Sequence, residues 1–162
     1  MDFSRYDKHI FPGSNTPEQP KVSICFITYK HEAYIRKSLD AILEQKTNFD
    51  FEIIIGEDHS PDGTAEIVRE YALKYPQKIK AYIRPENLGS KINYVHCFLD
   101  CKGEYIVHIE GDDYWTDALK LQSQVDFLDQ NPAASACFHN AEIIYEDGSN
   151  RAPELINPID QK

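Results

Sequence analysis

The stretch KVSICFITYKHEAYIRKSLDAILEQ, residues 21–45, joins two hydrophobic patterns of different period. Its first part, KVSICFIT, is a nearly continuous apolar run of strand length, whereas Ile35, Leu39, Ile42 and Leu43 recur at helical spacing. The polar segment TYKHE bridges the two patterns. This stretch therefore predicts a buried strand followed by an amphipathic helix.

The same strand and helix pattern repeats along the chain, with Ile67 and Tyr71 on the buried side of the second helix. Crossover helices carry the chain back to the same end of a sheet, so the strands are predicted to run parallel. The predicted fold class is α/β, with a Rossmann-like, mostly parallel central sheet covered by helices on both faces. The predicted strands cover residues 21–28, 51–58, 78–84 and 103–110, and the predicted helices cover residues 34–45, 60–75, 90–101 and 117–130.

The remaining segments complete the predicted domain organisation. Residues 1–20 are rich in proline, show no periodicity and predict an N-terminal extension on the surface. Residues 21–150 form the predicted domain, in which the segment 134–150 adds one or two strands that end at the turn EDGS. Residues 151–162 are interpreted as a tail or as the start of a further region.

Composition limits the classes of function. With 162 residues and 41% hydrophobic residues, the chain can form the core of one α/β domain. The start is polar and no apolar run approaches the roughly 20 residues of a membrane-spanning helix, so a cytoplasmic location is expected. A net charge of −10 with scattered basic residues argues against nucleic-acid binding.

Four cysteines are present, and none forms a CxxC pair. Buried thiols in a reducing compartment are therefore favoured over a zinc site. The four are Cys25, Cys97, Cys101 and Cys137.

Polar clusters follow each of the four predicted strands. They read TYKHE, GEDHSPDG, RPENLGS and EGDDYW in chain order. The carboxyl ends of parallel strands meet at one edge of a sheet, and ligands of such sheets bind there. The clusters therefore predict one shared ligand site.

The segment EGDD places Glu110, Asp112 and Asp113 together after a strand, with Gly111 between them. Neighbouring carboxylates repel one another unless a cation lies between them. Mg²⁺ or Mn²⁺ takes carboxylate oxygens and keeps positions for water and phosphate. An aspartate that caps the next turn would explain one of these acids and leave the other two without a role.

The other clusters allow two interpretations each. Asp58, with Glu57, could bind a base or ribose, or could accept hydrogen bonds from backbone amides. Tyr29 could stack on a base or pack on the helix below it. Lys91 and the start of its helix could meet a phosphate. His108 is interpreted as a partly buried histidine with its hydrogen bonds satisfied.

Motifs of several other enzyme classes do not occur in the sequence. There is no GxGxxG after the first strand, no GxxxxGK[ST] and no GxSxG. A metal-dependent nucleotidyltransferase usually carries a glycine-rich basic signature after its first strand, and TYKHE contains no glycine.

Four segments resemble the nucleotide-sugar domain of family 2 glycosyltransferases, which has a single A-type fold. They are VSICFITYKHEAYIRKSLDAIL, FEIIIGEDHSPDGT, NLGSKINY and GEYIVHIEGDDYWTDALKLQSQVDFL, in the family's order between residues 21 and 145. This resemblance implies a C-terminally incomplete A-type domain, in which residues 151–162 begin a missing acceptor-side region.

The resemblance also implies roles for individual residues. Thr28, Tyr29 and Glu32 would contact the nucleotide, and Asp58 would bind its base. The Asp-x-Asp element of the family corresponds to Glu110, Gly111 and Asp112, and the metal would be held by Asp112 and Asp113. Two departures from the family's DDGS element are Glu57 in place of the first acid and His59 in place of glycine.

The implied reaction is metal-dependent, inverting transfer of a sugar from a nucleoside-diphosphate sugar, most readily a UDP-sugar, to a hydroxyl. The acceptor would be a saccharide or a lipid-linked molecule in surface polysaccharide or glycoconjugate synthesis, with membrane association only through other regions. Because the family's base follows the fifth strand, we expect it beyond Lys162. The alternative is a noncatalytic nucleotide-binding or interaction domain.

Overall fold

The computed structural model describes residues 10–11, 14–146, 149 and 151–156. The chain divides into two compact units, residues 1–123 and 124–162. The first unit contains the predicted alternation of strands and helices. Its elements are β1 (Val22–Thr28), α1 (Ile35–Leu43), β2 (Phe51–Glu57), α2 (Thr64–Lys74), β3 (Ile79–Ile83), α3 (Ser90–Asp100), β4 (Tyr105–Glu110) and the start of α4 (Lys120–Gln130).

The four strands form one sheet in the order β3-β2-β1-β4. Every neighbouring pair is parallel, and Val22 of β1 lies beside Phe51 of β2 and Tyr105 of β4. β1 and β2 are buried along their whole length, which explains why their sequences are continuous apolar runs rather than alternating ones. This confirms the predicted parallel, Rossmann-like sheet.

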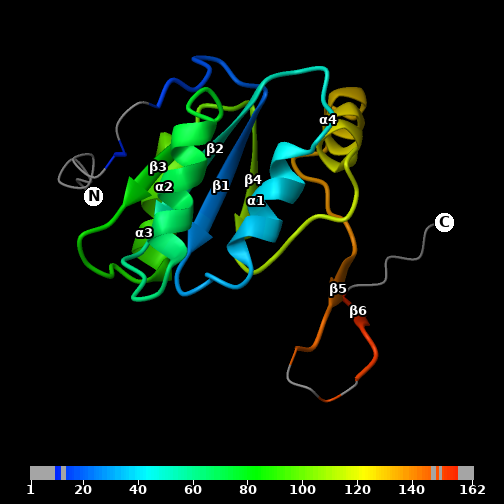
Figure 1. Ribbon diagram of the computed structural model, residues 1–162. Helices are drawn as coiled ribbons and strands as arrows, with labels where there is room; N and C mark the ends of the chain where they lie inside the picture. Colours follow the sequence, from blue (N-terminus) through cyan, green and yellow to red (C-terminus); the bar gives the residue numbers. More distant parts are fainter. Residues whose placement is uncertain (1–9, 12–13, 147–148, 150, 157–162) are drawn as a thin grey trace. The chain divides into compact units, whose positions relative to one another are not determined.

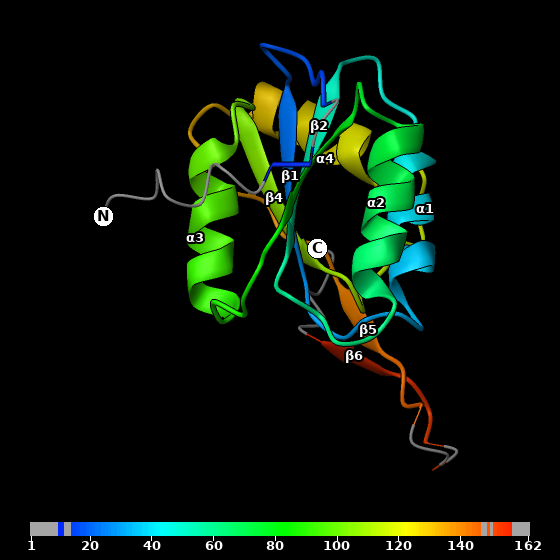
Figure 2. The same ribbon diagram turned by 60° about the vertical axis from the view of Figure 1, so that its left-hand side comes forward.

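Helices cover both faces of the sheet, as predicted. Figures 1 and 2 show α1 and α2 on one face and α3 on the other. Ile35, Leu39 and Ile42 of α1 are fully buried, as their spacing predicts. Under α3, the thiols of Cys25 and Cys97 lie in a buried cluster with Ile54. Both cysteines are free.

The described part of the N-terminal extension runs along the edge of β3. The Phe11 amide donates to the carbonyl of Ala81, and the Asn15 amide donates to that of Pro76, both at 2.7 Å. The Ser14 hydroxyl donates to the carbonyl of Ile79. These bonds occupy edge groups of a strand that would otherwise be open to another chain. Residues 1–9 and 12–13 of the predicted extension lie outside the described residues.

In the second unit, β5 (Ala141–Ile143) and β6 (Glu154–Ile156) pair antiparallel, with Ala141 opposite Ile156. β5 falls in the segment predicted to add strands, and β6 falls in the predicted tail. The predicted EDGS turn and the end of the tail fall partly outside the described residues, which omit 147–148, 150 and 157–162. Among the described residues, no helix is both long and apolar enough to cross a membrane.

Candidate nucleotide-sugar site

The carboxyl ends of the four strands surround a cavity of about 340 Å³. The parallel register brings these ends to one edge, so residues far apart in the sequence become neighbours. Four of the predicted site residues line the cavity: Thr28, Tyr29, Asp58 and Glu110. The other lining residues are Ile27, His31, Asn87, Gly89, Ser90 and Asn93.

The acidic segment continues directly from β4. Glu110 ends the strand, the Gly111 amide donates to the carbonyl of Ile27, and the Asp113 amide donates to that of Glu110. These bonds fix the turn against β1. Asp112 and Asp113 follow Glu110 on this turn and are exposed, so the three carboxylates lie together at the edge of the sheet.

The carboxylate of Asp113 is affected by its acidic neighbours. Partial desolvation of the Asp113 carboxyl, followed by the nearby carboxylates of Asp112 and Glu110, raises its pKa, while His108 and His31 lower it to a smaller extent. A raised carboxyl pKa means that the ionised form is destabilised by its surroundings. A cation beside Asp113 would offset this repulsion, and the predicted metal binding stays a prediction.

The arrangement fits a metal that keeps part of its shell for other ligands. Within the described part of the chain, no three acidic, histidine or cysteine side chains are already arranged around one point. The Asp112 side chain is 49% exposed and so can turn toward an ion. Mg²⁺ is commonly bound by one or two carboxylates together with water and substrate phosphates. Asp112 and Asp113 match that pattern.

Asp58 is already engaged by the loop after β3. Its Oδ1 accepts a hydrogen bond from the Leu88 amide at 2.8 Å, and its Oδ2 accepts one from the Gly89 amide at 2.9 Å. The Asn87 side chain donates to the Asp58 carbonyl. The structure thus realises the backbone-amide alternative at Asp58. Contact of the same carboxylate with a base stays a prediction, since each oxygen has a further lone pair.

Glu57 and His59 flank Asp58 with different roles. Glu57 is fully buried, and its Oε1 accepts a hydrogen bond from the Ser60 amide at 2.7 Å. His59 has φ of 60°, in the left-handed region. Glycine adopts that region without strain, and histidine is among the residues found there more often than most, so the backbone keeps the conformation that suits the glycine of the resembling family. Lys30 has the same φ, and the two lie in the loops after β2 and β1.

Thr28 ends β1, and Tyr29 follows it directly; both line the cavity. Tyr29 is 38% exposed, and Nζ of Lys30 lies 5.1 Å from the centroid of its ring. Thr28 is buried, and its hydroxyl lies 3.2 Å from Nδ1 of His31.

Glu32 and Lys91 do not line the cavity. Glu32 instead accepts a hydrogen bond from the Gly63 amide, at the turn before α2, and its own amide donates to Asp62. Lys91 is exposed in the first turn of α3. Their predicted contacts with the donor stay predictions.

His108 agrees with its interpretation as a histidine with satisfied polar groups. Its Nδ1 lies 3.2 Å from the carbonyl oxygen of Cys25, and its Nε2 lies 3.7 Å from Glu110. Its ring meets Tyr94 edge to face. The side chain is 39% exposed and lies on the same side of β4 as Glu110.

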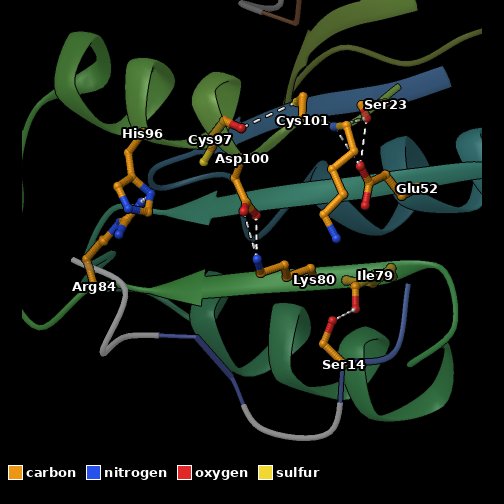
Figure 3. A network of polar contacts seen from close by, with 11 residues as sticks. Ser14, Ser23, Glu52, Ile79, Lys80, Arg84, His96, Cys97, Asp100 and Cys101 are labelled. Carbon is orange, nitrogen blue, oxygen red and sulfur yellow. Dashed lines mark hydrogen bonds and ion pairs between the residues drawn. The ribbon is translucent and has the colours of Figure 1, made fainter. Parts of the chain in front are cut away.

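Two residues that line the cavity, Asn93 and His31, were missed in the sequence. Asn93 is buried and lines the cavity, donating to the Gly56 carbonyl at 2.8 Å and accepting from Nε of Arg84 at 3.2 Å. Arg84 is itself buried and lies 2.9 Å from His96, as Figure 3 shows. Arg84 and Asn87 both belong to the predicted cluster RPENLGS, and Asn87 lines the cavity. A polar residue at a buried helix position, as Asn93 is within NLGSKINY, was the available signal.

Comparisons with known proteins identify the family of this chain. The family model of glycosyl transferase family 2 matches residues 23–161. An uncharacterized protein of Mycobacterium tuberculosis is 45% identical over 128 residues, which cover 79% of this chain and 37% of that protein. The putative glycosyltransferase EpsE of Bacillus subtilis is 33% identical over 112 residues, covering 69% of this chain and 40% of EpsE.

Solved structures show the same fold. Residues 1–349 of TarS from S. aureus, in complex with UDP, match with a TM-score of 0.61 and 26% identity, over 69% of this chain and 33% of that one. The mannosyltransferase PcManGT of Pyrobaculum calidifontis matches with a TM-score of 0.60 and 24% identity, over 77% of this chain and 37% of that one. The chain thus spans less than half of the length of each of these relatives. With its parallel sheet, the cavity at the strand ends and the family match, the chain belongs to glycosyl transferase family 2.

Proposed function

We propose that the chain is the donor-binding part of a metal-dependent, inverting glycosyltransferase that uses a nucleoside-diphosphate sugar, most readily a UDP-sugar. The observation that carries this proposal is the convergence of Tyr29, Asp58 and Glu110 on one cavity. Beside it lies an acidic turn with a raised aspartate pKa at Asp113. The likeness to TarS, solved with UDP and with UDP-GlcNAc, supports the choice of nucleotide.

Within this proposal, the protein groups bind and orient the donor. Tyr29 offers its exposed ring to the base, and Asp58 holds the neighbouring loop in place while its remaining lone pairs face the nucleotide. Glu110 contacts the ribose. A divalent ion held by Asp112 and Asp113 would offset the negative charge that develops on the diphosphate as the sugar leaves.

The acceptor side is proposed on chemical grounds. A hydroxyl of a saccharide or lipid-linked acceptor attacks the anomeric carbon from the face opposite the leaving diphosphate, with a general base to take its proton. The setting proposed for this step is the cytoplasmic face of a membrane, in surface polysaccharide or glycoconjugate synthesis. None of the described residues is assigned the role of base.

Calorimetric titration tests the donor site. UDP and GDP are titrated into the chain with and without Mn²⁺. We expect UDP to bind more tightly with Mn²⁺, and Asp112→Asn to remove most of this gain while leaving metal-free binding nearly unchanged. Equal UDP affinity with and without Mn²⁺ in the wild-type chain would contradict the metal-dependent part of the proposal.

An assay of UDP-sugar hydrolysis distinguishes a transferase from a domain that only binds nucleotide. The chain and a longer natural form that contains it are assayed side by side. Activity in the longer form supports the transferase. Nucleotide binding without turnover in either form would favour the alternative, a noncatalytic nucleotide-binding domain.

A further inference from the structure

The imidazole of His31 lies between the end of β1 and the acidic turn after β4. Its Nδ1 is 3.2 Å from the hydroxyl oxygen of Thr28, and its Nε2 is 3.7 Å from Oδ2 of Asp112. The His31 side chain is 18% exposed and lines the cavity. One side chain thus spans the two segments that carry the proposed donor and metal contacts.

The backbone of His31 is held independently of its ring. The His31 amide donates to the hydroxyl of Thr64, at the start of α2, at 3.0 Å. The His31 carbonyl accepts hydrogen bonds from the amides of Tyr34 and Ile35, both at 2.9 Å. Hydrogen bonds to the first residues of α1 and α2 therefore fix the backbone position of His31 and limit the positions that its ring can occupy.

Gly111 shows how closely the acidic turn approaches this ring. A Cβ atom at Gly111 would lie 2.5 Å from the Thr28 hydroxyl oxygen and 2.7 Å from Nδ1 of His31. Such distances are far below van der Waals contact, so a side chain there would displace one of the two partners. The glycine inside the acidic segment is thus explained by the approach of Thr28 and His31 to its backbone.

The tautomer of His31 follows from its partners. An ionised Asp112 can only accept a hydrogen bond, so the neutral imidazole lowers its energy by placing its proton on Nε2, which faces that carboxylate. Nδ1 is then an acceptor, and the Thr28 hydroxyl donates to it. At 3.7 Å the contact with Asp112 is longer than a hydrogen bond and acts electrostatically.

We propose that His31 is a positioning residue that orients the Asp112 carboxylate for the metal. This inference rests on the proposed function, because it assigns His31 a role toward the same metal site. Outer partners of metal-binding groups fix the orientation of those groups, and their loss typically lowers metal affinity about 10- to 100-fold. The ordered path runs from Thr28 through His31 to Asp112.

The test compares His31→Ala, His31→Gln and a matched control, His59→Asn. His59 is an exposed histidine in the loop after β2, and asparagine tolerates its left-handed backbone. Mn²⁺ affinity is measured by electron paramagnetic resonance without nucleotide, and UDP affinity by calorimetry with and without Mn²⁺. His31→Ala should weaken Mn²⁺ binding about tenfold. His31→Gln, which keeps an N–H donor, should recover part of it, and His59→Asn should match wild type.

A second measurement addresses the path through Thr28. Thr28→Val should weaken Mn²⁺ binding by a smaller factor than His31→Ala, and the double variant should be no weaker than His31→Ala alone, because both substitutions break the same path. If the losses of Mn²⁺ affinity in the two single variants add up in the double variant, Thr28 and His31 do not act through one path.

The remaining outcomes are equally distinct. If the His31→Ala variant binds Mn²⁺ as tightly as the wild-type chain does, the inference is overturned. An equal loss of UDP affinity with and without Mn²⁺ in that variant also overturns it, since this would indicate a structural role. If the wild-type chain binds Mn²⁺ but no nucleotide, the proposed function fails while the Mn²⁺ titration still decides the role of His31. A wild-type chain that binds no Mn²⁺ overturns both.

Discussion

The carboxylate of Asp58, in the loop after β2, accepts a hydrogen bond from the amide of Gly89, 31 positions later, at 2.9 Å. Gly89 has φ of 82°, and its Cα faces open space. The adjacent Leu88 amide donates to the other oxygen of the same carboxylate. One buried side chain therefore holds the loop that leads into α3, the helix whose first residues line the cavity.

Asp58→Asn should loosen this loop. The amide group of asparagine has one acceptor oxygen, so one of the two backbone donors loses its partner. Hydrogen bonds to charged groups contribute about 1.5–3 kcal/mol, and we expect the free energy of unfolding to fall by about 2 kcal/mol. UDP affinity should fall with and without Mn²⁺, unlike the metal-selective effect expected for Asp112→Asn.

Urea denaturation and calorimetry check this expectation. The control is Glu86→Gln, an exposed acid in the same loop. An Asp58→Asn chain with wild-type stability would show that the two amide contacts do not hold the loop.

Gly56→Ala should displace α3 from the sheet. A Cβ atom at Gly56 would overlap Oδ1 of Asn93 and lie 2.6 Å from the sulfur of Cys97. Overpacking of a core typically costs about 1–3 kcal/mol, and this loss of stability is measured by urea denaturation. Adding Cys97→Ala removes one of the two clashes and should recover part of the loss. No recovery would place the strain elsewhere.

Ser23→Ala should weaken the turn between α3 and β4. The Ser23 hydroxyl donates to the buried carboxylate of Glu52 at 2.7 Å and accepts from the amides of Lys102 and Gly103. Figure 3 shows Ser23 and Glu52 side by side. Buried polar groups left without a partner cost about 1–3 kcal/mol, so we expect a loss of about 2 kcal/mol.

Hydrogen exchange resolves where the Ser23→Ala effect occurs. The amide of Gly103 should exchange faster in the variant, together with a lower urea midpoint, whereas the amide of Lys102 keeps its hydrogen bond to Glu52 at 3.1 Å and should change less. Ser123→Ala, at an exposed position, is the control and should change neither. Unchanged exchange at the Gly103 amide would contradict the assigned role of Ser23.

Tyr71 makes the stability of the folded chain depend on pH in the alkaline range. Burial, and then the hydrogen bond to Asp40, raise its pKa from 10.0 to about 12. The folded chain therefore keeps the tyrosine proton at pH values where the unfolded chain has lost it. This contribution is fully present below pH 10 and is lost as the pH rises through about 12, since stability falls wherever the folded state binds more protons.

Tyr71→Phe should flatten this dependence. The variant loses the 2.7 Å hydrogen bond to Asp40, so at neutral pH it should be about 1 kcal/mol less stable. Between pH 10 and 12 its stability should fall less steeply than that of the wild type. Thermal denaturation across this range measures the difference, and parallel curves for the two chains would contradict the assignment.

Much of the site could be predicted from the sequence, because the spacing of apolar residues identifies the strands and helices and their order along the chain determines how the strands run. The apolar runs and the helical spacing of Ile35, Leu39 and Ile42 were enough to place the strands and helices, and alternation made the strands parallel. Parallel strands put their carboxyl ends at one edge. The meeting of Tyr29, Asp58 and Glu110 at one cavity followed from that rule.

The partners of these residues could not be predicted, because side-chain contacts depend on distances across the sheet. Asn93, from α3, closes on Gly56 of β2 only after the helix has packed, and His31 meets Asp112 only because β1 and β4 are neighbours in the sheet. Glu32 shows the same limit, since its carboxylate lies at the turn before α2 rather than at the cavity.

The amino-acid sequence by itself determined the order of elements, the direction of the strands and the edge at which acids gather, since these depend on local periodicity and on the crossover rule. Only the tertiary structure decided which oxygen faces which donor. Such pairings are set by side-chain rotamers and by close backbone approach, as at Gly111, between segments that the chain brings together from distant positions.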